Sequence, residues 1–142
     1  MKKLLLPILI LAFCGYTYGQ APTVIDLSGI TDDVLEDTIE YSTDGDRYPI
    51  EVILNPDVEY EIGSCRILQT TIVRSDPEQP KPVISIANNF WLGEVTLDSL
   101  IFEHLDFKCN WNYVFNNGND YTVGKVAFVD CRIEATDGVW RG

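Results

Sequence analysis

The chain has 142 residues, of which 46% are hydrophobic and 23% are charged, and this composition suits a single globular domain. Its formal net charge is −12 at pH 7. Nucleic acid and anionic lipid both bind to positively charged surfaces, so this charge argues against either as a partner.

Residues 1–19 have the pattern of a secretory signal peptide. Two lysines precede the apolar run Leu4–Cys14, and a polar stretch with small residues follows it. The run is too short to span a bilayer and no later segment is longer, so we predict no transmembrane segment in the mature chain. We expect cleavage after Gly19 or Gln20 and a secreted, periplasmic or cell-surface location. Loss of the leader leaves 8 basic and 22 acidic residues, a net charge of −14.

An alternative for the leader is lipoprotein anchoring at Cys14, because residues 11–14 faintly resemble a lipoprotein signal. Phe13 is bulky at a position where a small residue is expected. Export without a lipid anchor is therefore the favoured prediction.

Residues 20–48 form an N-terminal segment in which one short cap helix is expected. Thr31 is a suitable N-cap, acidic residues follow it in the first turn, and three apolar side chains lie at helical spacing. These features predict a helix over Asp32–Tyr41.

Twelve of the acidic residues lie between Asp26 and Glu61, where Arg47 is the only opposing charge. The simplest interpretation is a solvated face that keeps an exported protein soluble. A calcium site at Asp44 and Asp46 is the alternative, although two carboxylates need several further oxygen ligands to hold the ion. The full calcium-loop pattern is absent, so we predict no metal site and keep calcium as the weaker alternative.

Short strands separated by turns are expected over residues 49–142. Alternating or β-branched apolar residues mark them, bounded by proline, asparagine, aspartate and glycine. The predicted strands ahead of residue 90 are Ile50–Leu54, Val58–Ile62, Arg66–Arg74 and Pro82–Ala87.

The segment Val95–Phe107 is repeated in Gly124–Ala135, with Leu100 aligned on Val126. In both segments apolar and polar residues alternate, and the alternation slips once, at positions 103–104 and 129–130. Alternation indicates a half-buried strand, and the slip indicates a corner. Two short strands joined by a corner in each repeat predict an all-β fold, a parallel β-helix of about four coils. Its predicted inward residues are Ile72, Leu100, Phe102, Leu105, Phe107, Val126, Phe128, Cys131 and Ile133.

A second match, at a slightly longer spacing, aligns positions 87–89 with 115–117 and Ile72 with Leu100. Asparagines at equivalent places on successive coils can satisfy one another and the nearby backbone. We therefore predict a stacked amide ladder of Asn88 on Asn116 and Asn89 on Asn117.

The order of these elements resembles a known superfamily. A leader and a short acidic helix precede a strand, a proline-containing turn, and Glu-Tyr-Glu-Ile-Gly. Then come Leu-Gln-Thr-Thr-Ile-Val-Arg-Ser-Asp, Lys-Pro-Val-Ile-Ser-Ile and Leu-Asp-Ser-Leu-Ile-Phe-Glu-His-Leu-Asp-Phe. This looks like the N-terminal cap and first coils of pectate-lyase-like right-handed parallel β-helix proteins, close to poorly characterised secreted bacterial members found beside polysaccharide-degrading systems. The resemblance covers Asp32–Gly142 and implies the fold, but it leaves the activity open.

The resemblance also sets an expectation for the C-terminal end. Proteins of this superfamily usually stack many more coils, and their polysaccharide-cleaving members carry catalytic acids or calcium-binding aspartates on central coils. This sequence stops shortly after its fourth expected coil, without a recognisable cap. Because an uncapped solenoid end exposes unpaired strand edges, we expect either missing C-terminal coils or a partner that covers the open end.

The repeat brings several charged or titratable side chains onto one outward surface, on coils about 4.8 Å apart. A base beside a cation that stabilises an anionic sugar would suit a catalytic groove. Charge pairing on a solvated face is the simpler interpretation. The stacked pairs are His104 on Asp130, Asp106 on Arg132, and Lys108 on Glu134, so the candidate catalytic residues are His104, Asp106, Asp130, Arg132 and Lys108.

Four aromatic residues in or beside turns form the second group of candidates. Exposed flat rings stack on sugar faces and are enriched at recognition surfaces. The alternative is that the rings cover the core at the bases of loops. The candidate carbohydrate-binding residues are Trp91, Trp111, Tyr113 and Tyr121.

Cys65, Cys109 and Cys131 remain in the mature chain. An odd count in an exported protein allows one disulfide with a free thiol, or three buried thiols. No CxxC spacing is present and the chain has a single histidine, so no structural zinc site is predicted.

Three classes of function fit the sequence. We favour an exported or cell-envelope domain that recognises extracellular polysaccharide without cleaving it. A polysaccharide lyase or glycoside hydrolase is the alternative, and it requires two facing carboxylates or a calcium site with a basic residue. A structural or adhesion stalk is the third class, because any solvated β-helix would serve as one.

Overall fold

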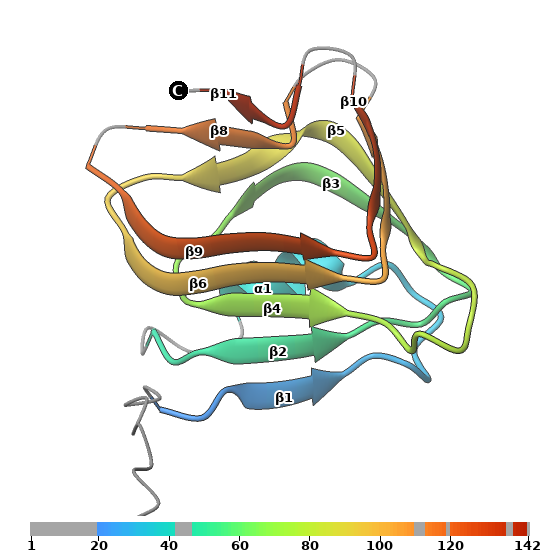
Figure 1. Cartoon of the computed structure of the whole chain (residues 1–142). Helices are drawn as coiled ribbons and strands as arrows, with labels where there is room; N and C mark the ends of the chain where they lie inside the picture. Colours follow the sequence, from blue (N-terminus) through green and yellow to red (C-terminus); the bar gives the residue numbers. More distant parts are fainter. Residues whose placement is uncertain (1–19, 42–46, 110–112, 119, 136–137, 142) are drawn as a thin grey trace, which may run out of the picture.

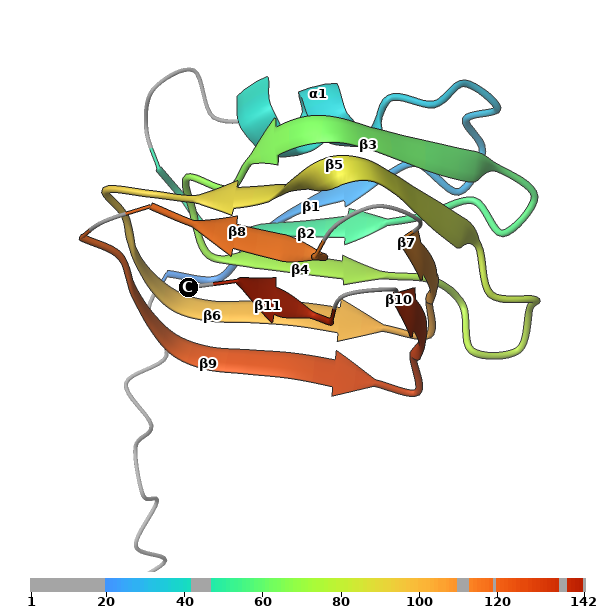
Figure 2. The ribbon, with the colours of Figure 1, turned by 90° about the horizontal axis from the view of Figure 1, so that it is seen from above.

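The computed structural model describes residues 20–41, 47–109, 113–118, 120–135 and 138–141. These residues form a right-handed parallel β-solenoid of about four coils with one short helix near the N-terminus (Figures 1 and 2). The predicted fold class is confirmed. The leader at 1–19, together with Asp44, Asp46 and Trp111, lies outside the described residues.

One wall of the solenoid is a five-stranded sheet in which all neighbouring strands are parallel. Each of its strands comes from a different coil, and their arrows point the same way in Figure 1. In spatial order the strands are β1 (Thr23–Asp26), β2 (Ile50–Ile53), β4 (Thr71–Arg74), β6 (Thr96–Glu103) and β9 (Thr122–Val129).

The second sheet makes the other two walls, because its long strand β5 (Val83–Leu92) changes partners along its length. The first part of β5 pairs with β7, and the part from Phe90 onwards pairs with β8. The remaining strands are β3 (Glu59–Arg66), which pairs with β5, then β7 (Asp106–Cys109), β8 (Phe115–Asn117), β10 (Arg132–Ala135) and β11 (Trp140–Arg141).

The repeat found in the sequence gives the correct register of the last two coils. Leu100 lies opposite Val126 and Phe102 opposite Phe128 in the first sheet. In the second sheet Asp106 lies opposite Arg132. The repeat also extends to the corners: His104 and Asp130 both have positive φ, as do Glu94 and Asp120, which precede β6 and β9 at equivalent places.

The prediction that Ile72 points inward is wrong. Ile72 lies opposite Ile101 and is half-buried, whereas Thr71 lies opposite Leu100 and is fully buried. The buried Thr71 hydroxyl donates a 2.8 Å hydrogen bond to the carbonyl oxygen of Gln69, so a polar residue occupies an inward position without an unsatisfied group. Because Thr71 is polar, the pattern of apolar residues does not show which residues of β4 point inward. The sequence match that aligns Ile72 with Leu100 is therefore one residue away from the true register, in which Thr71 lies opposite Leu100.

The predicted asparagine ladder is also wrong. Trp91 lies opposite Asn116 and Leu92 opposite Asn117, so this coil is shorter than the predicted pairing requires. Asn89 instead donates a 2.7 Å hydrogen bond to the Asn88 side chain at the bend of β5. Because the coils differ in length, no fixed spacing in the sequence gives all of their registers.

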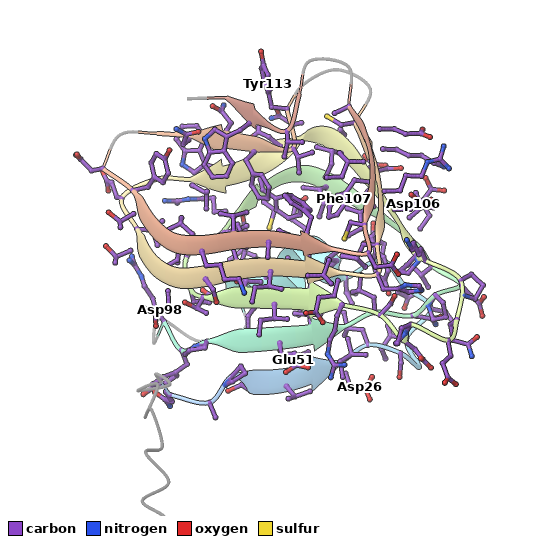
Figure 3. The ribbon with its side chains drawn as sticks, viewed as in Figure 1. Asp26, Glu51, Asp98, Asp106, Phe107 and Tyr113 are labelled. Atoms are coloured by element: carbon purple, nitrogen blue, oxygen red, sulfur yellow. The ribbon has the colours of Figure 1, made fainter. Side chains whose placement is uncertain are left out.

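Inside the solenoid, aromatic rings from successive coils stack on one another. The rings of Phe102 and Phe128 are 5.4 Å apart and nearly parallel, and Phe107 meets Phe102 edge-on at 5.3 Å. Phe107 points into the solenoid in Figure 3, while Asp106 beside it points outward. Such pairs add to the stabilisation from burial. The whole ring cluster comprises Phe90, Phe102, Phe107, Phe115, Phe128 and Trp140.

Helix α1 (Leu35–Tyr41) closes the N-terminal end of the solenoid. It lies beside β3 in Figure 2 and buries Leu35 and Ile39 completely. The helix was expected to begin at Asp32 with Thr31 as its cap, but it begins at Leu35. The acidic residues serve the neighbouring strand: Asp33 accepts a 2.7 Å hydrogen bond from the backbone N–H of Glu61.

Two acids within α1 continue this row of carboxylates. Glu36 accepts a hydrogen bond from the N–H of Gly63 at 2.7 Å, and Glu40 accepts one from the N–H of Arg66 at 2.6 Å. These N–H groups lie on the edge of β3 that faces α1. Part of the acidic excess is therefore structural, because it satisfies a strand edge that would otherwise be open. The strand expected over Arg66–Arg74 is interrupted, with β3 ending at Arg66 and β4 beginning at Thr71.

Replacing Glu36 with alanine leaves the Gly63 N–H without its partner beneath the helix. An orphaned backbone donor costs about 1–3 kcal/mol, so the free energy of unfolding should fall by about that amount in a urea titration. Asp37→Ala is the matched control, because Asp37 is an exposed acid in the same helix and its loss should cost about 0.5 kcal/mol or less. Equal losses for the two variants would contradict a capping role for Glu36.

Candidate functional site

An outward row of side chains crosses the second sheet at one register position. Arg66 on β3 lies opposite Trp91 on β5, which lies opposite Asn116 on β8. Trp91 points outward because its neighbours Phe90 and Leu92 are fully buried. Successive coils are about 4.8 Å apart, so a cation, an indole and an amide lie side by side on this face. Figure 2 shows β3, β5 and β8 next to one another.

Trp91 borders a hollow of about 270 Å³ at the end of this row. We call it the Trp91 hollow. Its lining comes from the end of β3, the end of β5 with the loop that follows, and the turn after β8. The lining residues are Arg66, Trp91, Gly93, Glu94 and Gly118.

The indole of Trp91 fits only because two neighbouring residues are glycines. A Cβ at Gly93 would lie 2.8 Å from the indole Nε1, and a Cβ at Gly118 would lie 2.9 Å from Cζ2. Both distances are shorter than van der Waals contact. Glycine at these places therefore leaves the space that the ring occupies. The Gly118 N–H donates a 2.7 Å hydrogen bond to the Leu92 carbonyl oxygen, which links the turn after β8 to the end of β5.

The polar groups around the Trp91 hollow have both signs of charge. Arg66 and Glu94 are exposed, and Asn116 beside Trp91 is half-buried. A flat ring flanked by hydrogen-bonding groups of both kinds suits a ligand with an apolar face and several hydroxyls, because the ring contacts the face and the polar groups bind the hydroxyls. A sugar ring has this chemistry.

The other predicted aromatic residues that the structure describes are engaged elsewhere. Tyr121 is half-buried, its hydroxyl accepts a 3.0 Å hydrogen bond from Asn117, and its ring centroid is 6.0 Å from that of Trp140. Tyr113 is half-buried and lies against Gly138 at the far end of the molecule in Figure 3. Of the predicted carbohydrate-binding residues that the structure describes, Trp91 is the one that borders a hollow with polar groups.

A second hollow, of about 380 Å³, lies on the outer face of the first sheet. Ile72 and Ile101, stacked on adjacent strands, form its floor together with nearby prolines. Asp98 is the one charged residue in its lining, which contains no aromatic ring. This hollow offers a sugar fewer specific contacts than the Trp91 hollow does.

His104 and Asp130 meet at a corner between the last two coils, as the repeat predicts. Nδ1 of His104 lies 2.6 Å from Oδ2 of Asp130, and Nε2 lies 2.8 Å from the carbonyl oxygen of Gln79. Lys81 donates a 2.8 Å hydrogen bond to the other oxygen of Asp130. The hydrogen bond to the Gln79 carbonyl, and then that to Asp130, raise the pKa of His104. Those from Lys81 and His104 lower the pKa of Asp130.

Both ring nitrogens of His104 face oxygen acceptors. A carbonyl oxygen and an ionised carboxylate can only accept, so satisfying both requires the imidazolium with two N–H donors. In this state His104 has no lone pair with which to act as a base. The arrangement joins three chain segments: the loop around Gln79 and Lys81, the corner at His104, and the last coil at Asp130.

The remaining catalytic candidates do not converge on a hollow. Arg132 forms an ion pair with Glu134 on its own strand. Asp106 and Lys108 lie on β7 opposite Arg132 and Glu134, in the predicted register. None of the five candidates lines either of the two hollows. Among the described residues, no group of three or more histidine, cysteine, aspartate or glutamate side chains is arranged to hold a metal ion.

The cysteines have core positions. Cys65 is a buried thiol whose pKa is raised by burial. Cys131 is a half-buried thiol near the carbonyl oxygens of Phe102 and Val129, both 3.4 Å from its sulfur, and burial raises its pKa as well. Cys109 is buried in the core. The raised pKa values of Cys65 and Cys131 lower the fraction of thiolate, which is the nucleophilic form of cysteine.

Comparisons with protein-family models, curated proteins and solved structures find no match for this chain. The part of the chain that the structure describes contains no helix long and apolar enough to cross a membrane. Any assignment of function therefore depends on the geometry of the fold and of the Trp91 hollow.

The corner at His104 predicts a pH dependence of stability. The pKa of His104 in the folded state lies above the unfolded value of about 6.5. The stabilisation of the folded state by His104 is therefore fully present below about pH 6.5 and is lost as the pH rises through the folded pKa. Asp130 has the opposite effect, because its pKa is lowered in the folded state. It stabilises the folded state above about pH 3.9, and this stabilisation is lost as the pH falls through the folded pKa. Urea midpoints should therefore fall as pH is raised from about 6 to about 8.5.

The control for this prediction is His104→Asn, because asparagine tolerates the φ of 57° at this position and does not titrate. His104 is the only histidine of the chain, so the variant should lose the fall in midpoint over this pH range. An unchanged pH dependence in the variant would show that another group is responsible. A nuclear magnetic resonance titration of the single imidazole would give the folded pKa directly.

Proposed function

We propose that this chain is an exported domain of the pectate-lyase-like β-helix type that recognises extracellular polysaccharide without cleaving it. The observation that carries the proposal is the Trp91 hollow. Two glycines make room for the indole of Trp91, and Arg66 and Glu94 flank it on a rigid sheet face. Rigid aromatic rings with polar neighbours bind ligands at a low entropic cost.

Two features of the sequence, the leader pattern and the net charge, support the same assignment. The leader pattern at residues 1–19 favours export, which would place this surface where extracellular polysaccharide can reach it. A net charge of −14 on the mature chain repels polyanions, so a neutral polysaccharide is the better ligand.

Recognition without catalysis is favoured by the state of His104. Its ring nitrogens both lie within hydrogen-bond distance of acceptors, and it lies apart from the lining of the Trp91 hollow. Hydrolysis of a glycosidic bond by the usual route needs two carboxylates that flank the bond. The lining of the Trp91 hollow contains one, Glu94.

The test is calorimetric titration of the mature chain with a panel of neutral polysaccharides and their oligosaccharides. Trp91→Ala should weaken binding by about tenfold or more, since truncation of an aromatic anchor commonly costs about 2 kcal/mol. Tyr48→Ala is the matched control, because Tyr48 is a 43% exposed aromatic residue ahead of β2 that does not line the Trp91 hollow, and its loss should leave affinity unchanged.

Each contrary outcome has a definite meaning. Binding that survives Trp91→Ala in a variant with native circular dichroism would remove the Trp91 hollow as the site. Release of new reducing or unsaturated sugar ends would show that the chain is an enzyme. Absence of binding across the whole panel would leave the structural or adhesion stalk as the better account.

A further inference from the structure

Among the described residues, four other than glycine have a backbone φ in the left-handed region, and Glu94 is the unusual one. Its φ is 51°, and the φ angles of His104, Asp120 and Asp130 lie between 48° and 62°. Asparagine, aspartate and histidine are the residue types enriched in this region, and glutamate is not among them. The backbone conformation therefore accounts for the residue type at the other three positions but not at position 94.

The comparison with Asp120 is direct, because Glu94 and Asp120 occupy equivalent corners of adjacent coils. Glu94 lies two residues ahead of Thr96, Asp120 lies two residues ahead of Thr122, and the two threonines face each other in the first sheet. A left-handed conformation is unfavourable for a residue with a Cβ, and such costs are concentrated at functional sites. A glutamate at this corner therefore points to a role for its side chain.

The side chain of Glu94 lies where a ligand in the Trp91 hollow would meet it. Glu94 lines the hollow together with Trp91 and Arg66. Both charged residues are exposed, and none of the four ion pairs among the described residues includes either of them. Their charged groups are therefore available to a bound sugar.

The two charges have opposite effects on an acidic sugar. The guanidinium of Arg66 can bind the carboxylate of a uronic acid through two parallel hydrogen bonds. The carboxylate of Glu94 only accepts hydrogen bonds, so it binds sugar hydroxyls and repels a second carboxylate. Removal of the Glu94 charge would leave Arg66 unopposed and would make the hollow a better site for an acidic sugar.

We propose that Glu94 determines the specificity of the Trp91 hollow: its carboxylate binds the hydroxyls of neutral sugars and excludes uronic acids. This inference rests on the proposed function, because it requires that the hollow binds a sugar. It assigns the preference for neutral polysaccharide to one residue of the site rather than to the net charge of the chain alone.

Calorimetric titrations at low ionic strength test this inference, because exposed charges are least screened there. The probes are pairs of oligosaccharides that differ in charge: those of glucose and glucuronic acid, of mannose and mannuronic acid, and of galactose and galacturonic acid. The mature chain should bind the neutral member of at least one pair about tenfold more tightly than the acidic member. Glu94→Gln removes the charge and keeps the shape, so it should lower this affinity ratio by about tenfold.

The matched control is Glu78→Gln, which makes the same change in net charge. Glu78 is an exposed residue in the loop between β4 and β5 and does not line the Trp91 hollow, so its loss should leave the affinity ratio unchanged. Glu94→Gly is a second test variant, because glycine adopts this φ without strain. Its urea midpoint should not fall, whereas its affinity ratio should fall as in Glu94→Gln.

The outcomes separate this inference from the proposed function. An unchanged affinity ratio in Glu94→Gln, in a chain whose binding is still weakened by Trp91→Ala, would overturn the role of Glu94 and leave the proposed function intact. An equal fall of the ratio in the Glu78 and Glu94 variants would also overturn it, because net charge would then set the preference. Absence of binding to every pair overturns the inference, whereas the proposed function fails only when the wider panel of neutral polysaccharides gives no binding either.

Discussion

The hydrogen-bonding demand of strand edges governs how this solenoid is built. Inner coils satisfy their backbone groups and bury their apolar faces against the coils on either side, whereas an end coil has a neighbour on one side only. At the N-terminal end the edge of β3 is satisfied within the chain, because α1 covers the core and Asp33, Glu36 and Glu40 accept N–H bonds from β3, while β1 is the outermost strand of the first sheet. At the other end the described residues leave β9 with a free edge.

The same stacking explains why an outward site on this fold is rigid. Trp91 is fixed by its strand, whose inward neighbours Phe90 and Leu92 are locked in the aromatic and aliphatic core. Its ring is held against Gly93 and Gly118, which come from two different coils. A ligand that binds there therefore meets a preformed surface, and little entropy is lost in ordering it.

The sequence predicts those features of the fold in which every inward position is apolar. The repeat between the last two coils gives their register and the contact of His104 with Asp130. The second match, at the longer spacing, fails at Thr71, where a buried hydroxyl is satisfied locally, and at β5, where coil length changes. The sequence marks Trp91 as an aromatic residue beside a turn, but it does not predict the hollow next to it, because the clearance of the indole over Gly93 depends on distances that no linear pattern contains.

We propose that polysaccharide is recognised at the Trp91 hollow. The most direct measurement is a nuclear magnetic resonance titration of the isotope-labelled mature chain with a neutral oligosaccharide. The account predicts saturable shifts of the Trp91 indole N–H and of the Gly93 and Gly118 amides. Shifts confined to Ile72 and Ile101 on the first sheet, or to the corner at His104, would contradict it.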